Sequence, residues 1–141
     1  MDSGNLWKPP SQADIKRPLI LAVEDNEDNL DLLQTVLMLM DYSFVAATDG
    51  NTGLAMAQQY QPDLILLDMM LPDIEGIEIA SQLKQNEQTK AIPIIAVTAM
   101  ARAQDRERAI KAGCNEYITK PYDMEELERL IKHYVLNNDT V

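Results

Sequence analysis

The chain of 141 residues is 46% hydrophobic and 25% charged, and it carries a formal net charge of -11. A chain of this size and composition forms one folded domain with a full hydrophobic core, and its acidic surplus disfavours direct binding to nucleic acid or to an anionic membrane surface. No apolar run approaches the roughly 20 residues that a bilayer-spanning helix needs, and residues 1–17 lack the apolar core of a signal peptide, so we expect a cytoplasmic protein.

Cysteine and histidine are scarce in the chain. Cys114 is the single cysteine and His133 the single histidine, so neither an internal disulfide nor a cluster of histidine and cysteine ligands can form. Any bound metal ion must therefore be held by oxygen ligands.

Residues 1–17 differ in pattern from the rest of the chain. They contain Gly4, Pro9 and Pro10 among mixed polar residues and show no sustained periodicity. We expect a flexible leader, in which Trp7 is either an exposed aromatic or a contact for a partner.

From Pro18 onward, short apolar runs alternate with amphipathic stretches. Five runs have strand length, and three of them are apolar without alternation, as is typical of parallel strands buried on both faces. The five runs are Leu19–Val23, Phe44–Ala47, Leu64–Leu67, Ile94–Val97 and Glu116–Thr119.

Helical spacing fills the intervals between these runs. Leu30, Leu33, Leu37 and Met40 recur at three or four residues, and so do Leu127, Leu130, Ile131 and Tyr134. Weaker patterns cover residues 52–60, 77–83 and 103–112. Five strands that are each followed by a helix predict an α/β fold, a doubly wound three-layer sandwich around a five-stranded parallel sheet.

Polar side chains follow four of the five predicted strands. They are Glu24-Asp25-Asn26, Asp68, Thr98 and Lys120. In open α/β sheets the ligand site lies beyond the carboxyl ends of the strands, so we expect these side chains to surround one pocket. For Asp25 or Asn26 taken alone, a helix N-cap is an equally good interpretation.

The expected pocket holds three carboxylates, one hydroxyl and one ammonium. Three close carboxylates repel one another, and a bound divalent cation is the simplest way to stabilise them. An oxygen-only ligand set with room for water suits Mg²⁺. The sequence therefore predicts a magnesium site that can also receive a phosphoryl group.

These motifs resemble those of the CheY-like response-regulator receiver family. The resemblance rests on Glu24-Asp25-Asn26, on residues 68–76 (DMMLPDIEG), on Thr98-Ala99 and on Lys120-Pro121, in the family's order and spacing. It covers roughly Pro18 to Leu136. It implies a flavodoxin-like (βα)5 sandwich with strand order 2-1-3-4-5, and we expect a receiver domain over residues 18–137 and a tail over residues 138–141.

The resemblance also assigns expected roles to single residues. Asp68 becomes the phosphoacceptor and a metal ligand, Asp25 a direct ligand of Mg²⁺, Glu24 a ligand through water, and Met70 a ligand through its backbone carbonyl. Lys120 and Thr98 become contacts of the phosphoryl group, and the Lys120–Pro121 peptide bond is expected to be cis. Tyr117 is the aromatic residue that is expected to change rotamer when Thr98 moves.

The expected function is a phosphorylation-dependent signalling switch in a two-component system or phosphorelay. Such a protein is not a metabolic enzyme, since it catalyses only its own phosphoryl transfer and autodephosphorylation. The expected partners are a histidine kinase or histidine phosphotransfer protein and a downstream effector, which binds the surface formed by residues 100–112, the strand Glu116–Thr119 and the last helix. No output module precedes Val141, so a stand-alone receiver is expected.

Two alternatives from other classes remain open. The first is a receiver-like scaffold that binds partners without being phosphorylated, although every expected site residue is present. The second is a phosphohydrolase of the haloacid-dehalogenase type, which also uses an Asp nucleophile and Mg²⁺. Its usual second Asp, two residues after the nucleophile, is replaced by Met70, so the general acid/base is missing.

Overall fold

The computed structural model describes residues 17–139, with side chains through residue 136. The predicted leader up to residue 16, with Trp7, and the last two residues of the predicted tail lie outside the described residues. Within the described part, no helix is both long and apolar enough to cross a membrane.

Strands and helices alternate along the described chain, as predicted. The strands are β1 (Leu19–Val23), β2 (Ser43–Ala47), β3 (Leu64–Leu67), β4 (Ile94–Thr98) and β5 (Glu116–Thr119), and the helices are α1 (Glu27–Leu39), α2 (Gly50–Tyr60), α3 (Gly76–Gln85), α4 (Ala103–Ala112) and α5 (Met124–Asp139). The strand boundaries differ from the predicted runs by at most one residue.

Helices α1 and α2 begin earlier than their apolar periodicity indicates. The side chain of Asn26 accepts a hydrogen bond from the backbone amide of Asn29, and that of Asp49 accepts one from the amide of Thr52. The amides of the first helical turn have no hydrogen-bond partner within the helix, and these N-caps satisfy some of them. A helix can therefore start before its first buried apolar residue.

All five strands are parallel, and their order is β2-β1-β3-β4-β5. In the register of the sheet, Val23 at the end of β1 lies opposite Leu67 at the end of β3, and Leu67 lies opposite Ala96 in β4. The predicted flavodoxin-like sandwich with order 2-1-3-4-5 is therefore confirmed. The carboxyl ends of the inner strands β1 and β3 therefore lie next to each other, on the side of the sheet where all five strands end.

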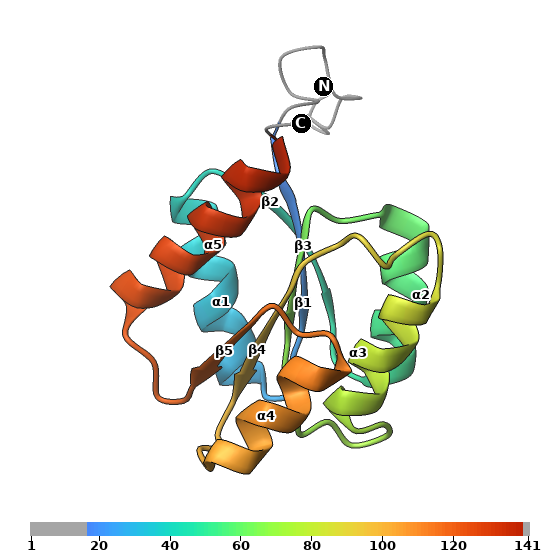
Figure 1. Ribbon diagram of the computed structural model, residues 1–141. Coiled ribbons are helices and arrows are strands. Elements are labelled where there is room, and N and C mark those ends of the chain that lie inside the picture. Colours follow the sequence, from blue (N-terminus) through green and yellow to red (C-terminus); the bar gives the residue numbers. More distant parts are fainter. Residues whose placement is uncertain (1–16, 140–141) are drawn as a thin grey trace.

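The sheet separates two hydrophobic cores (Figure 1). Helices α1 and α5 cover one face, where Leu37, Leu127 and Ile131 are fully buried. Helices α2, α3 and α4 cover the other face, where Ala57 and Ile79 pack against the sheet. Burial on both faces explains why β1 and β3 are apolar throughout and why β4 is apolar up to its last residue, Thr98.

Candidate functional site

Three acidic side chains meet at the carboxyl ends of the two central strands β1 and β3. Glu24 and Asp25 follow β1, Asp68 follows β3, and one carboxylate oxygen of each lies within 4.8 Å of the others. Glu24 is 1% exposed and Asp68 6% exposed, whereas Asp25 is open to solvent. The cluster therefore has two buried carboxylates and a third at its rim.

Sheet hydrogen bonds fix the backbone under the two buried carboxylates. The amide of Glu24 donates to the carbonyl of Ala47 at 2.9 Å, and the amide of Asp68 donates to the carbonyl of Val23 at 3.0 Å. Both residues thus continue the strand ladders by one step. Asn26 serves as the N-cap of α1, so the N-cap interpretation holds for Asn26 and leaves Asp25 to the acidic cluster.

Lys120 inserts its ammonium group between the two buried carboxylates. Its Nζ lies 2.7 Å from Oε1 of Glu24 and 3.1 Å from Oδ2 of Asp68. The Lys120–Pro121 peptide bond is cis, as the resemblance implies. The sequence reasoning assigned Lys120 only to the phosphoryl group and missed its contact with Glu24.

Burial and charge act in opposite directions on this ion pair. Burial raises the pKa of Glu24 above its ordinary value, and the hydrogen bonds from Lys120 and from the amide of Asn26 offset part of that rise. Burial alone lowers the pKa of Lys120, but the hydrogen bond to Glu24 and the charge of Asp68 outweigh it and raise that pKa. The ammonium group is therefore held in its charged form beside the acids.

The loop after Asp68 folds back onto its carboxylate. The amide of Met70 donates to Oδ1 of Asp68 at 2.9 Å, and the amide of Gly76 donates to the carbonyl of Met69 at 3.0 Å. A Cβ at Gly76 would lie 2.5 Å from the Cα of Met69, so this close return of the chain requires glycine. The Met70 side chain is 57% exposed at the rim.

Thr98 of β4 and Tyr117 of β5 are both buried, and both contact the backbone of Met100. Thr98 at the end of β4 is fully buried, and its Oγ1 accepts a hydrogen bond from the amide of Met100 at 3.3 Å. The hydroxyl of Tyr117 donates to the carbonyl of Met100. The amide of Lys120 in turn donates to the carbonyl of Thr98 at 2.8 Å, which joins this part of the site to the acidic cluster.

Asp73 belongs to the motif at residues 68–76, but its contacts were not predicted from the sequence. The two carboxylate oxygens of Asp73 accept hydrogen bonds from the amides of Gly50 and Asn51 at 2.7 and 2.9 Å. These two amides begin helix α2, which precedes β3 in the chain. No local pattern around Asp73 indicates the contact, because it joins segments more than 20 residues apart.

The donor set fits a hard divalent cation. Among the described residues, the ion pairs of the three-carboxylate cluster are those of Lys120 with Glu24 and Asp68, so an excess of negative charge remains, and all candidate ligand atoms are oxygens. Mg²⁺ takes oxygen ligands and keeps part of its water shell, which the exposed position of Asp25 permits.

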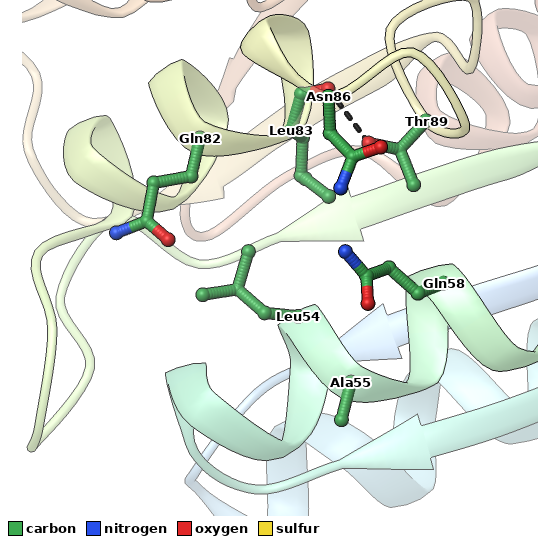
Figure 2. Close-up of a pocket in the computed structure, with 7 residues that line it drawn as sticks. All are labelled: Leu54, Ala55, Gln58, Gln82, Leu83, Asn86 and Thr89. Atoms are coloured by element: carbon green, nitrogen blue, oxygen red, sulfur yellow. Dashed lines mark hydrogen bonds between the residues drawn. The ribbon is translucent and has the colours of Figure 1, made fainter.

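A separate hollow lies between α2 and α3 (Figure 2). It has a volume of about 120 Å³, and Leu54 and Gln58 of α2 face Leu83 and Asn86 across it. Thr89 also lines the hollow, and its hydroxyl donates a hydrogen bond to the carbonyl of Leu83 at 2.7 Å. The hollow shares no residue with the acidic cluster.

Comparison with known proteins finds response regulators as relatives of this chain. The family model of the response regulator receiver domain matches residues 20–132. The polar-differentiation response regulator DivK of Brucella abortus is 38% identical over 116 residues, which cover 82% of this chain and 94% of that protein. The DNA-binding dual master transcriptional regulator RpaA of Synechocystis is 36% identical over 124 residues, 88% of this chain, but this chain spans only 52% of RpaA.

A solved structure supports the same assignment. The receiver domain of the sensor histidine kinase PA1611 of Pseudomonas aeruginosa, with a magnesium ion in its active-site cleft, is 33% identical with a TM-score of 0.79. The match covers 84% of this chain and 98% of that domain. The chain therefore belongs to the response regulator receiver domain family, the phosphorylation-dependent signalling switches of two-component systems.

Proposed function

We propose that Asp68 is the phosphoacceptor of this receiver domain, which we take to span residues 18–137. The observation that carries the proposal is the surrounding of its carboxylate. One oxygen accepts the Met70 amide, the other faces the Lys120 ammonium, and two further carboxylates lie within 4.8 Å. A nucleophile held at both oxygens is oriented before its substrate arrives.

Mg²⁺ is the cofactor in this proposal, as in the PA1611 receiver domain. Asp25 and Asp68 would bind it directly, Glu24 through water, and Met70 through its backbone carbonyl. When bound, the ion would offset negative charge on the acids and on the phosphoryl oxygens.

The proposed reaction moves one phosphoryl group from a phosphohistidine to Asp68. A carboxylate oxygen of Asp68 attacks phosphorus, the N–P bond of the donor breaks, and the imidazole nitrogen keeps the bonding electron pair and takes up a proton. Lys120 and the Thr98 hydroxyl are positioned to contact the phosphoryl oxygens. Attack by water on the acyl phosphate later returns Asp68 and inorganic phosphate, and these two steps are the only catalysis that we propose.

The output is a protein contact. Thr98 drawn toward the phosphoryl group would release the Met100 amide and let the Tyr117 ring turn, which would change the surface of α4, β5 and α5. We propose that a histidine kinase or histidine phosphotransfer protein supplies the phosphoryl group in the cytoplasm and that an effector protein binds the changed surface. Direct binding to nucleic acid is not part of the proposal.

Intact-mass measurement tests the acceptor. Wild-type protein, Asp68→Asn and the control Asp31→Asn, which alters an exposed carboxylate of α1, are incubated with acetyl phosphate and Mg²⁺. We expect one added phosphoryl group on the wild type and the control and none on Asp68→Asn, which keeps its fold because the substitution removes one negative charge from a crowded site. Uptake by Asp68→Asn at the wild-type rate would show that Asp68 is not the acceptor.

A further inference from the structure

The loop between Asp68 and Gly76 is tied at both ends to the backbone beneath it. At its start, the Met70 amide bonds to Asp68, and at its end the Gly76 amide bonds to the carbonyl of Met69. Both ties lie next to the sheet. They leave the middle of the loop, residues 71–75, to be held by other contacts.

Asp73 supplies a directional contact in the middle of this loop. Its two carboxylate oxygens accept hydrogen bonds from the consecutive amides of Gly50 and Asn51 at 2.7 and 2.9 Å. These hydrogen bonds lower the pKa of Asp73, so the carboxylate is ionised at neutral pH. Leu71 and Ile74 also pack against the core, but apolar contacts do not fix a direction as two hydrogen bonds from consecutive amides do.

The fit between the loop and the first residue of α2 is close. A Cβ added at Gly50 would lie 2.7 Å from Cδ1 of Ile79 in α3, 3.1 Å from Oδ1 of Asp73 and 3.2 Å from Cβ of Ile74. Glycine at position 50 therefore lets the loop approach the helix. The close approach at Gly50 and the two hydrogen bonds to Asp73 are parts of the same contact between α2 and the loop.

The Met70 side chain packs little against the rest of the protein, so it does little to fix the position of the Met70 backbone. That side chain is 57% exposed, so the location of the Met70 backbone depends on the ties before and after it. After Met70, the next loop residue whose polar side chain is hydrogen-bonded to another element is Asp73, three residues later.

We propose that Asp73 is a positioning residue for the metal site: it clamps the loop to the start of α2 and thereby holds the Met70 carbonyl in place for Mg²⁺. This inference rests on the proposed function, which makes that carbonyl a ligand. Asp73 does not contact the ion and acts only through the loop.

The chain offers a matched control for the helix end. Asp49 caps the same helix by accepting the amide of Thr52 at 2.8 Å, but its side chain makes no such bond to the loop. Loss of the Asp49 carboxylate weakens α2 without releasing residues 71–75. A second control, Glu75→Gln, removes a charge from an exposed loop residue whose side chain makes no capping bond.

The test measures Mg²⁺ binding by isothermal titration calorimetry together with the melting temperature. We expect Asp73→Ala to raise the dissociation constant on the order of 10-fold, and Asp49→Ala and Glu75→Gln to change it by less than about 2-fold. Asp73→Asn, which keeps one acceptor oxygen, falls between the wild type and Asp73→Ala. We expect Asp49→Ala to lower the melting temperature without weakening Mg²⁺ binding, which distinguishes a loss of stability from a loss of Mg²⁺ affinity.

Gly50→Ala gives an independent perturbation that keeps every charge. Its added methyl group would crowd Ile79 of α3 at 2.7 Å as well as Asp73 and Ile74 at 3.1 and 3.2 Å, so the loop can no longer sit as close to α2, and we expect weaker Mg²⁺ binding if Asp73 acts by position. The inference is overturned if Asp73→Ala and Gly50→Ala both bind Mg²⁺ as Asp49→Ala does. If wild-type Asp68 takes up phosphate while these affinities are equal, only this inference fails, whereas absence of uptake by the wild type contradicts the proposed function itself.

Discussion

Replacing Lys120 by methionine tests the ion pair at the centre of the site. Methionine keeps much of the length and volume of lysine but removes the ammonium group that lies 2.7 Å from Glu24 and 3.1 Å from Asp68. Glu24 is 1% exposed, so its carboxylate then lies in the protein interior without its cationic partner.

The size of the effect follows from this burial. Removing one partner of a buried ion pair costs about 3–5 kcal/mol, and we expect the lower end, about 3 kcal/mol, because the Lys120 side chain is 16% exposed. The loss should be smaller in Mg²⁺, since the more negative variant site binds the cation more tightly and is stabilised more by it. Glu24→Gln introduced into the Lys120→Met background should restore part of the stability, because it removes the unpaired charge.

Acid should reduce the difference between wild type and Lys120→Met. Burial already raises the pKa of Glu24 in the wild type, and loss of the Lys120 hydrogen bond raises it further in the variant. A carboxyl group whose pKa is raised on folding stabilises the fold at low pH and loses that contribution as pH rises through the folded pKa. The stability deficit of Lys120→Met should therefore shrink as the pH falls from 7 toward the ordinary value of 4.5.

Urea unfolding followed by circular dichroism measures these differences, in buffers with EDTA or with Mg²⁺. Wild type, Lys120→Met, Glu24→Gln and the double variant form one thermodynamic cycle. A Lys120→Met protein as stable as the wild type in EDTA at pH 7 would refute the reasoning. A double variant less stable than Lys120→Met would do the same.

Three further predictions concern signal lifetime, switching and the buried thiol. The apolar Met70 and Met100 side chains cannot orient a water well, so Met70→Asn with Met100→Glu should speed phosphate loss after the phosphodonor is removed, and equal or slower loss would contradict this. Helix α4 buries only Asp105 and Ala109, so its hydrogen exchange should change on adding beryllofluoride, and identical protection would count against the proposed switch. Burial raises the pKa of Cys114 to about 12, so its stabilising contribution persists below the ordinary pKa of 9.0 and is lost as pH rises toward 12. Ellman's reagent should react with the folded protein at pH 8 roughly 100-fold or more slowly than with the protein in urea.

The fold was predictable because its signals are local. The uninterrupted apolar runs at Leu64–Leu67 and Ile94–Val97 are typical of strands covered on both faces, and the helical spacing between the runs indicated crossovers. Helix starts were less predictable, since the first turns at Glu27 and Gly50 depend on capping side chains and contain few buried apolar residues.

Much of the acidic cluster was also predictable, because parallel strands end at one edge of the sheet. That rule brings Glu24, Asp25 and Asp68 together without any knowledge of distances. The contacts that the sequence did not indicate are tertiary and specific. The bond between Lys120 and Glu24 joins residues 96 positions apart, and the Asp73 clamp depends on the path of a loop, which no periodicity encodes.

Mapping the phosphorylated residue tests the central claim most directly. The protein is phosphorylated by a phosphohistidine donor in Mg²⁺, the acyl phosphate is reduced with borohydride, and tandem mass spectrometry of the peptides locates the modified residue. We expect modification of Asp68 alone, and none when EDTA is present from the start. Modification of Asp25 or of another acidic residue instead of Asp68, or equal modification in EDTA, would contradict the account.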